Sequence, residues 1–452
     1  MIFRQVFFSL LLISATAGSV IAQYVYPKEP EVLQNLHEWQ DLKFGLFMHW
    51  GPYSQWGVAE SWTLEPTDKG WGERPKDKSY FEYVHEYEGL QKTFNPVNFA
   101  PEKWSAAAKA AGMRYVVFTT KHHDGFCMFD TKQHDYKITS AACPFHTNPR
   151  SNLTKEIFGA FRNDGFKIGA YYSIIDWHHD DFWWRYFPPT GAKMNYDVKK
   201  YPQKLANFQD YMDRQMSELS DGDYGKIDIY WFDYVGCPVD YKRFATTIRK
   251  NQPSALLVFR GGGEWENYRT PEQYIPDKAL DYPWETCMTL DGNSWCYRPK
   301  PDFKSSREVI HNLLLIVSRG GNFLLNIAPG PDGDWHPDAY ERLKETGAWM
   351  NVNSEAIYGT KAVAPYQETK LVFTQKDKYI YAAYLADEDE THVPAVIAVN
   401  SFCPAKGSKV YLLGHSSPLS WAPNGMGFVV RIPASVQKNP PSRHAFVLKF
   451  QK

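Results

Sequence analysis

The feature that most constrains this chain is a repeated alternation of short apolar strands and helix patterns between about residues 40 and 355. The predicted strands are rich in Val, Ile, Phe and Tyr with little polar alternation, which is typical of strands buried on both faces. They lie at 43–49, 114–121, 167–173, 227–233, 255–260 and 322–328, with helix patterns at 101–111, 153–161, 204–219, 241–250, 306–317 and 337–350. This alternation predicts an α/β domain, and at this size a (β/α)8-like TIM barrel is the commonest single domain of that kind.

A doubly wound sheet is the alternative, but no Gly-x-Gly-x-x-Gly turn follows the first strand. After Gly359 the pattern changes to short strands with turn residues between them and no helix pattern, at 370–375, 378–385, 395–402, 409–413, 427–432 and 445–450. Such spacing is typical of a small antiparallel β-sandwich. We therefore expect a (β/α)8-like domain over residues 23–358 and a C-terminal β-sandwich over residues 359–452.

The first 22 residues are typical of a secretory signal peptide. Arg4 is their only charge, an apolar run covers residues 6–13, and Ala22 is a small residue before Gln23. The run is too short to span a bilayer, although a retained N-terminal anchor is the alternative. We expect an exported protein, periplasmic or secreted and of bacterial type, with no membrane segment once the signal is removed.

The charge balance argues against a nucleic-acid partner, and the cysteine pattern argues against a disulfide scaffold. The sequence has 50 Lys+Arg and 51 Asp+Glu without any block of like charge, so it lacks the footprint of a nucleic-acid binder. Its 6 cysteines are scattered without a Cys-x-x-Cys pair, so we expect mostly free buried thiols. Aromatic residues make up 16% of the chain, and they serve either as core or as flat faces for a neutral ligand such as a sugar.

Polar side chains follow the apolar runs at the end of one predicted strand after another. In a parallel barrel the carboxyl ends of the strands meet at one mouth, where the chemistry takes place. We therefore expect the following residues to gather there: His49 and Trp50, His122 and His123, Tyr171, Trp231 and Asp233, Arg260, and Glu285.

The histidines and Asp233 each allow two interpretations. His49, His122 and His123 could bind zinc or iron in a metal-dependent hydrolase, but adjacent histidines on a strand point to opposite sides, so we favour a site without a metal. Asp233 ends an apolar strand, so its carboxylate has to be paired, and Arg260 is the candidate partner. A capping role for Asp233 is the alternative.

A series of motifs between about residues 40 and 330 resembles the α-L-fucosidases of glycoside hydrolase family 29. The motifs are Lys43-Phe44-Gly45-Leu46-Phe47-Met48-His49-Trp50-Gly51, Lys121-His122-His123-Asp124-Gly125-Phe126, Trp231-Phe232-Asp233, Thr270-Pro271-Glu272-Gln273, Pro283-Trp284-Glu285-Thr286-Cys287 and Gly321-Asn322-Phe323-Leu324-Leu325-Asn326. The resemblance implies a retaining enzyme with two catalytic carboxyl groups, a β-sandwich tail, and no metal or other cofactor.

By this resemblance Asp233 is the nucleophile. The acid/base is less well determined, because Glu264, Glu266, Glu272 and Glu285 all follow Arg260. The Thr-Pro-Glu motif favours Glu272, and Glu285, in the Trp-Glu-x-Cys motif that ends at Cys287, is the second choice.

The same match implies a fucose pocket and a substrate. The predicted contacts are His49, Trp50, Glu60, Trp62, His122, His123, Tyr171, Trp231, Arg260 and Trp295. The family has Glu and Trp adjacent, whereas Ser61 separates Glu60 from Trp62 in this chain. We expect an exo-acting α-L-fucosidase that acts on fucosylated oligosaccharides or glycoconjugates, with a catalytically inactive glycan-binding relative as the alternative.

Overall fold

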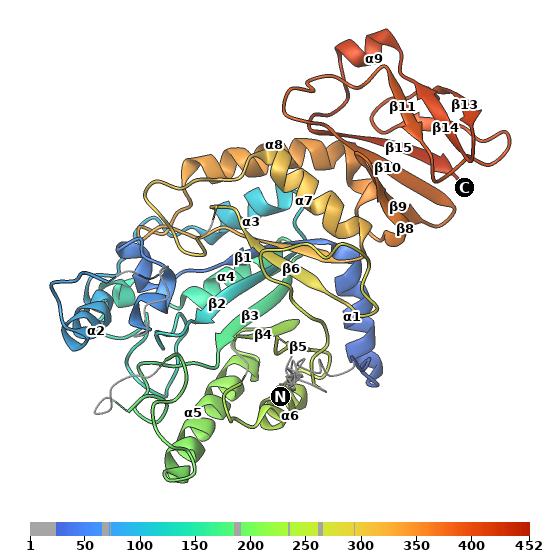
Figure 1. Cartoon of the computed structure of the whole chain (residues 1–452). Helices are drawn as coiled ribbons and strands as arrows, with labels where there is room; N and C mark the ends of the chain where they lie inside the picture. The colour runs from blue at the N-terminus through green and yellow to red at the C-terminus, as the bar shows by residue number, and fades with distance from the viewer. Residues whose placement is uncertain are drawn as a thin grey trace, which may run out of the picture.

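The structure is a computed structural model that describes residues 24–65, 72, 74–184, 191–233, 236–260, 265–292 and 294–452. An α/β unit is followed by antiparallel sheets at the C-terminal end of the chain (Figure 1). The predicted signal peptide, residues 1–22, lies outside the described residues. Among the helices of the described ranges, none has the length and apolar character needed to cross a membrane.

In the described part of the chain, seven parallel strands form one sheet in the order β5-β4-β3-β2-β1-β7-β6. The strands are β1 (Phe44–Met48), β2 (Tyr115–Lys121), β3 (Lys167–Ser173), β4 (Ile229–Asp233), β5 (Leu256–Val258), β6 (Glu285–Thr289) and β7 (Asn322–Asn326). The prediction of a parallel α/β sheet is confirmed. The sheet is curled into part of a barrel, which is consistent with a (β/α)8-like domain (Figure 1).

An irregular segment, residues 267–273, lies between β5 and β6. On one side the Asn267 amide donates to the Leu257 carbonyl at 2.8 Å, and on the other the Glu285 amide donates to the Arg269 carbonyl at 2.9 Å. The segment also makes isolated parallel bridges to the chain around β6. It therefore joins the two outer strands of the sheet and runs in the strand direction towards their carboxyl ends.

Helices α3 (Pro101–Ala110), α4 (Leu153–Asn163), α5 (Pro202–Ser220), α6 (Tyr241–Asn251), α7 (Ser306–Ser318) and α8 (Pro337–Asn353) surround the sheet (Figure 1). Helix α1 (Pro30–Leu42) instead packs Val32, Leu36 and Trp39 into the core inside the curl, and α2 (Tyr80–Gly89) lies apart from the sheet, at the left of the view. The predicted helices are confirmed, whereas α1 and α2 were not predicted. A capping box formed by Ser79 and Glu82 begins α2. Short 3₁₀ helices lie in the connections: η1 (Pro52–Gln55), η2 (Glu60–Leu64), η3 (Leu90–Lys92), η4 (Pro144–Thr147) and η5 (Ser354–Ala356).

Side chains of the curled sheet alternate between two cores. One core fills the inside of the curl and includes Phe47, Val117, Tyr171, Trp231 and Leu324. Their neighbours along the strands point outward into the core beneath the helices: Met48, Phe118, Tyr172, Phe232 and Leu325. Since strand side chains alternate with a period of two, the residue two positions after Trp231 points inward again. That residue is Asp233, the last of β4.

The C-terminal part contains antiparallel sheets, as predicted. In the described residues they have the orders β12-β15-β10-β9-β8 and β11-β14-β13 around one shared core. The strands are β8 (Lys361–Glu368), β9 (Leu371–Lys376), β10 (Tyr379–Leu385), β11 (Val396–Val399), β12 (Val410–Leu412), β13 (Ser420–Asn424), β14 (Gly427–Arg431) and β15 (Ala445–Gln451). A short helix, α9 (Ala434–Lys438), interrupts a region where no helix was predicted.

Strands β8 and β13 were missed because both are edge strands with little apolar alternation. Each contains a proline, Pro365 in β8 and Pro423 in β13, which an edge strand tolerates because it has a side without a partner strand. The burial pattern of each is mostly exposed or intermediate. Neither strand therefore has the buried apolar run by which a strand is predicted from sequence.

Candidate active site

Asp233 ends β4 and lies at the carboxyl edge of the sheet, with 15% of its side chain exposed. Its Oδ1 accepts a hydrogen bond from Nη1 of Arg260 at 2.9 Å. Its Oδ2 accepts a hydrogen bond from the Tyr171 hydroxyl at 2.7 Å. Burial and the charge of Asp233 raise the pKa of Tyr171 well above its usual value, so the phenol keeps the proton that it donates.

Arg260 connects Asp233 to a second carboxyl group. It follows β5 with a φ of 54°, in the left-handed region, and its Nη2 donates to Oε2 of Glu272. Burial opposes the charge of Arg260, but Asp233 and Glu272 together raise its pKa above the usual value. The guanidinium also lies over the Trp231 ring, 5.3 Å from the ring centroid. Two carboxyl groups are thus held on the two arms of one permanent cation.

Three neutral histidines lie beside this pair. Burial lowers the pKa of His49 and of His123 to about 4, and it lowers the pKa of His122 well below its usual value. His123 is next to the carboxylate, with Nε2 3.8 Å from Oδ2 of Asp233. At neutral pH these rings therefore contribute hydrogen bonds without a charge.

Each of the three imidazoles is fixed through its Nδ1 by a polar residue that the sequence analysis did not assign to the site. His49 is bonded to Asn326 Oδ1 at 2.8 Å, His122 to Ser61 Oγ at 2.6 Å, and His123 to Ser173 Oγ at 2.5 Å. Asn326 and Ser173 end β7 and β3, so the rule that polar residues follow strands would have found them. No such signal marks Ser61, which lies between Glu60 and Trp62 and does not follow a strand.

Aromatic rings and a buried carboxyl group surround the histidines. Trp62 packs edge-on against His123 with 4.9 Å between ring centroids, and Trp295 lies 5.1 Å from His49. Glu60, in η2, is 3% exposed, and burial raises its pKa to about 8 because the charged form loses its hydration. Glu60 is therefore mostly protonated at pH 7.

Glu285 does not lie at the mouth. It is the first residue of β6, so the prediction that it follows a strand at the carboxyl edge is wrong. Its carboxyl group is buried inside the curl, where it accepts hydrogen bonds from the Tyr115 hydroxyl at 2.5 Å and from the Trp231 Nε1 at 3.3 Å. Cys287, two residues later, also points into this inner core.

Trp50 and the remaining glutamates are also placed away from the cluster. The Trp50 indole is buried in the core outside the sheet, where it donates to the Gly330 carbonyl at 2.9 Å and packs against Trp104. Glu266 is buried, with Oε2 3.9 Å from the Arg269 Nε, and Glu264 lies outside the described residues. Of the three candidate glutamates in the described ranges, Glu272 is the one that shares a guanidinium with Asp233.

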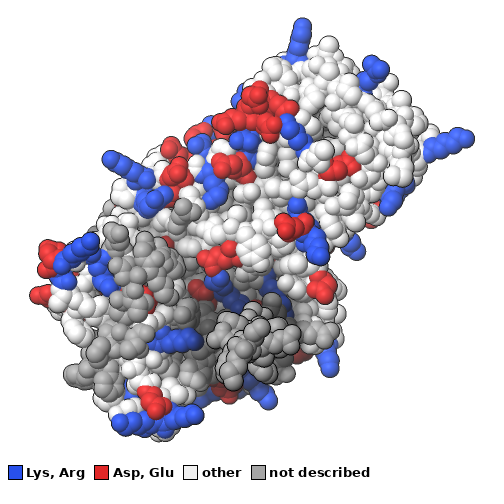
Figure 2. Space-filling view, viewed as in Figure 1, with Lys and Arg blue, Asp and Glu red and all other residues white. Residues whose placement is uncertain are grey.

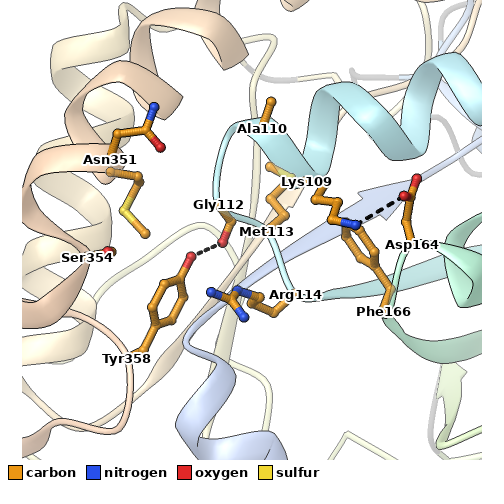
Figure 3. A pocket seen from close by; sticks show the side chains of 12 residues that line it. Lys109, Ala110, Gly112, Met113, Arg114, Asp164, Phe166, Asn351, Ser354 and Tyr358 are labelled. Carbon is orange, nitrogen blue, oxygen red and sulfur yellow. Dashed lines mark hydrogen bonds and ion pairs between the residues drawn. The ribbon is translucent and has the colours of Figure 1, made fainter.

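The opposite end of the sheet has a different character. A cavity of about 260 Å³ lies near the amino ends of β2 and β3, between α3 and α8 (Figure 3). Two contacts join residues of its lining: Lys109 pairs with Asp164, and the Tyr358 hydroxyl donates to the Gly112 carbonyl (Figure 3). Within the described residues, no three His, Cys, Asp or Glu side chains are grouped so that they could hold a metal ion, at either end.

Two carboxyl groups on one guanidinium, with neutral hydrogen-bonding rings and aromatic side chains around them, lie at the carboxyl edge of an α/β sheet, and paired carboxyl groups are what glycoside hydrolases use as a class. A family model described as Alpha-L-fucosidase matches residues 12–355. The chain therefore belongs to the α-L-fucosidase family, glycoside hydrolase family 29, and the resemblance seen in the sequence is confirmed.

Individual relatives agree over nearly the whole length. The tissue alpha-L-fucosidase of Rattus norvegicus is 30% identical, covering 98% of this chain and 96% of that protein. The plasma alpha-L-fucosidase of Homo sapiens is 28% identical, covering 92% of this chain and 90% of that protein. The solved structure of alpha-L-fucosidase isoenzyme 1 from Paenibacillus thiaminolyticus is similar with a TM-score of 0.78 and 32% identity, covering 93% of this chain and 99% of that one.

Proposed function

We propose that this glycoside hydrolase releases terminal α-L-fucose from fucosylated oligosaccharides or glycoconjugates with retention of configuration, using Asp233 as nucleophile and Glu272 as acid/base. The observation that carries the proposal is the Arg260 guanidinium, which donates to both carboxyl groups. Retaining glycosidases hold their two carboxyl groups roughly 5–5.5 Å apart. A shared guanidinium keeps the two carboxyl groups near each other, which supports a retaining mechanism.

In the first step an oxygen of Asp233 forms a bond to the anomeric carbon while the bond from that carbon to the aglycone oxygen breaks. Glu272 gives its proton to the departing oxygen. Arg260 and Tyr171 orient the carboxylate of Asp233 for the attack. Glu272 suits proton transfer to the aglycone, because it is the more exposed carboxyl group, with 37% of its side chain accessible.

In the second step Glu272 takes a proton from a water molecule, whose oxygen attacks the anomeric carbon. The ester bond to Asp233 breaks, and the carboxylate returns to Arg260 and Tyr171. Two inversions at the same carbon give net retention. In this proposal the neutral His49, His122 and His123, together with Glu60, bind sugar hydroxyl groups, and Trp62 and Trp295 pack against the ring and its methyl group.

The substrate is tested by turnover of 4-nitrophenyl α-L-fucoside, with the matching β-L-fucoside and α-D-galactoside as controls. We expect hydrolysis of the α-L-fucoside alone, at a rate that EDTA does not change. Good activity on another sugar with none on the fucoside would refute the substrate, and loss of activity in EDTA would favour the metal-dependent alternative.

The roles are tested by azide rescue of Asp233→Ala, Glu272→Ala and Glu285→Ala. Glu272→Ala should keep activity on the 4-nitrophenyl fucoside, whose leaving group needs little protonation, and azide should yield α-L-fucosyl azide. Asp233→Ala should yield the β-azide instead, because a single displacement inverts the anomeric carbon. If Glu285→Ala alone forms the α-azide, Glu285 is the acid/base and our assignment is wrong.

We also propose the larger organisation of the protein. Residues 1–22 would be removed on export to a periplasm or to the exterior, residues 23–358 would form a (β/α)8-like catalytic domain closed by the segment 267–273, and residues 359–452 would form the β-sandwich. The hydrogen bonds from 267–273 to both β5 and β6 support the closed barrel. N-terminal sequencing of the exported protein tests the processing site, which should lie before Gln23.

A further inference from the structure

The hydrogen bond that a histidine makes through Nδ1 decides whether its other nitrogen donates or accepts, and His49 is the clearest case here. Asn326 donates through its Nδ2 to the Trp295 carbonyl at 2.8 Å, which turns its Oδ1 towards His49. Because this oxygen can only accept, Nδ1 of His49 carries the proton. Its Nε2 therefore holds a lone pair and accepts a hydrogen bond.

His122 faces a different partner, the hydroxyl of Ser61. Oγ of Ser61 accepts a hydrogen bond from the Asp124 amide at 3.1 Å and lies 2.6 Å from Nδ1 of His122. Ser61 is fully buried. In the described part of the chain, Nδ1 of His122 is the one acceptor recorded for the Ser61 hydroxyl hydrogen.

A protonated Nδ1 on His122 would leave that buried hydroxyl hydrogen without an acceptor, which folded proteins avoid. The hydroxyl therefore donates to Nδ1 of His122. Since burial keeps this imidazole neutral, its single proton resides on Nε2.

We propose that Ser61 is a positioning residue that makes His122 a hydrogen-bond donor, opposite in sense to the acceptor His49 beside it. The two rings are 5.5 Å apart between centroids and meet edge to face. The two neighbouring rings then offer one donor and one acceptor to the proposed ligand, which would select a sugar with an oxygen that accepts from His122 and a hydroxyl that donates to His49. This inference rests on the proposed function for the identity of the sugar.

The tautomers can be measured without a substrate. In protein labelled with ¹⁵N-histidine, the unprotonated imidazole nitrogen resonates far from the protonated one, and the signals of His49 and His122 are assigned from His49→Gln and His122→Gln spectra. We expect an unprotonated Nδ1 for His122 and an unprotonated Nε2 for His49. The same tautomer at both rings would overturn the proposal, whatever the folding of any serine variant.

Binding then tests whether the tautomer sets specificity. We expect Ser61→Ala to raise the inhibition constant of L-fucose about tenfold, the effect of one lost hydrogen bond. The same inhibition constants are measured for 2-, 3- and 4-deoxy-L-fucose. The analogue that lacks the oxygen bound by His122 should have the same inhibition constant for the wild-type protein and for Ser61→Ala. Equal weakening of all four sugars would show a general loss of packing and overturn the proposal, as would no change in any of them.

Ser54→Ala is the matched control, because Ser54 is a buried serine of the same region whose hydroxyl donates to the Gly51 carbonyl. It should leave the four inhibition constants and the His122 tautomer unchanged, and a Ser54→Ala profile like that of Ser61→Ala would count against the proposal. If the wild-type protein binds no fucose, the proposed function fails, while the ¹⁵N spectra of the free protein still decide the role of Ser61.

Discussion

At the scale of single residues, the site depends on hydrogen bonds that hold one charged carboxylate in place. Tyr171→Phe removes the donor to Asp233, and a hydrogen bond to a charged group contributes roughly 1.5–3 kcal/mol. We therefore expect kcat/KM for an aryl α-L-fucoside to fall by about 10- to 100-fold.

The neighbouring Tyr172→Phe is the control for this variant. The Tyr172 hydroxyl points to the other side of the sheet and donates to Oε1 of Gln215 at 2.6 Å. Tyr172→Phe should keep kcat/KM within about twofold of wild type. Equal losses in the two variants would mean that the Tyr171 hydrogen bond does not act on the reacting carboxylate.

Glu285 is expected to affect stability in a pH-dependent way. Burial raises its pKa from 4.5 in the unfolded chain to about 7, so between these values the folded protein keeps a proton that the unfolded chain has lost. The free energy of unfolding therefore falls as the pH rises through this window. Glu285→Gln removes that dependence, so the stability of the variant relative to wild type should rise by about 3 kcal/mol from pH 4.5 to pH 7.

Urea unfolding of both proteins at pH 4.5 and pH 7 measures this difference. A wild-type to variant difference that is the same at both pH values would show that Glu285 does not titrate in this window. Because the carboxyl group faces Trp231 inside the curl and not the mouth, the variant should also keep the acid/base limb of the pH profile of kcat.

Much of the candidate site follows from one rule, that polar residues at the carboxyl ends of parallel strands meet. The rule predicted the strand-end positions of His49, His122 and Asp233. It misplaced Glu285, because a polar residue beside an apolar run can either begin or end a strand, and the sequence alone does not distinguish the two cases. Ser61 could not be predicted as a partner of His122, because the approach of η2 to β2 is a tertiary contact without a local signal.

At the scale of elements, the inside of the curl is close-packed, and Gly45 in β1 shows how closely. A Cβ at Gly45 would lie 2.3 Å from the Tyr115 ring, whose hydroxyl binds Glu285. Gly45→Ala should therefore lower the free energy of unfolding by about 1–3 kcal/mol through overpacking, measured by urea unfolding.

Gly159→Ala is the matched substitution on a helix. Gly159 lies inside α4, and a Cβ there would meet nothing within 4 Å. It should raise stability by about 0.5–1 kcal/mol, because alanine is the better helix former. If Gly45→Ala proved as harmless as Gly159→Ala, the inner core would be looser than the structure indicates.

The elements also show which parts of the fold a sequence reveals. Buried strands such as β2 and amphipathic helices such as α6 are visible in the sequence, because their apolar residues form a continuous run or recur at helical spacing. Edge strands such as β13 lack it, since one of their sides has no partner strand. The segment 267–273 is not a regular strand at all, and its place between β5 and β6 depends on hydrogen bonds that only the assembled sheet provides.

At the scale of the whole molecule, the α/β unit and the C-terminal sheets share a core. The Trp349 indole, on α8, donates to the Ala445 carbonyl of β15 at 2.9 Å, and residues of both parts belong to one buried cluster. We expect a single unfolding transition in calorimetry. Trp349→Ala should destabilise the protein by about 3–5 kcal/mol and separate the transition into two. Two independent transitions already present in the wild type would contradict this coupling.

The surface carries charges of both signs in small groups, without a broad patch of one sign on the face shown in Figure 2. This distribution agrees with the near balance of 50 basic and 51 acidic residues. A neutral deoxysugar needs no steering by charge, so we expect KM for the aryl fucoside to be insensitive to salt between low and moderate ionic strength.

The central claim is that Asp233 forms the covalent bond to fucose, and trapping with 2-deoxy-2-fluoro-α-L-fucosyl fluoride tests it most directly. The fluorine slows both steps, and the good leaving group restores the first one, so the intermediate accumulates. Mass spectrometry should show one added fluorofucosyl group per chain, located on the peptide that contains Asp233 and absent from Asp233→Ala. A label on Glu272, Glu285 or any other residue of an active preparation would contradict the account.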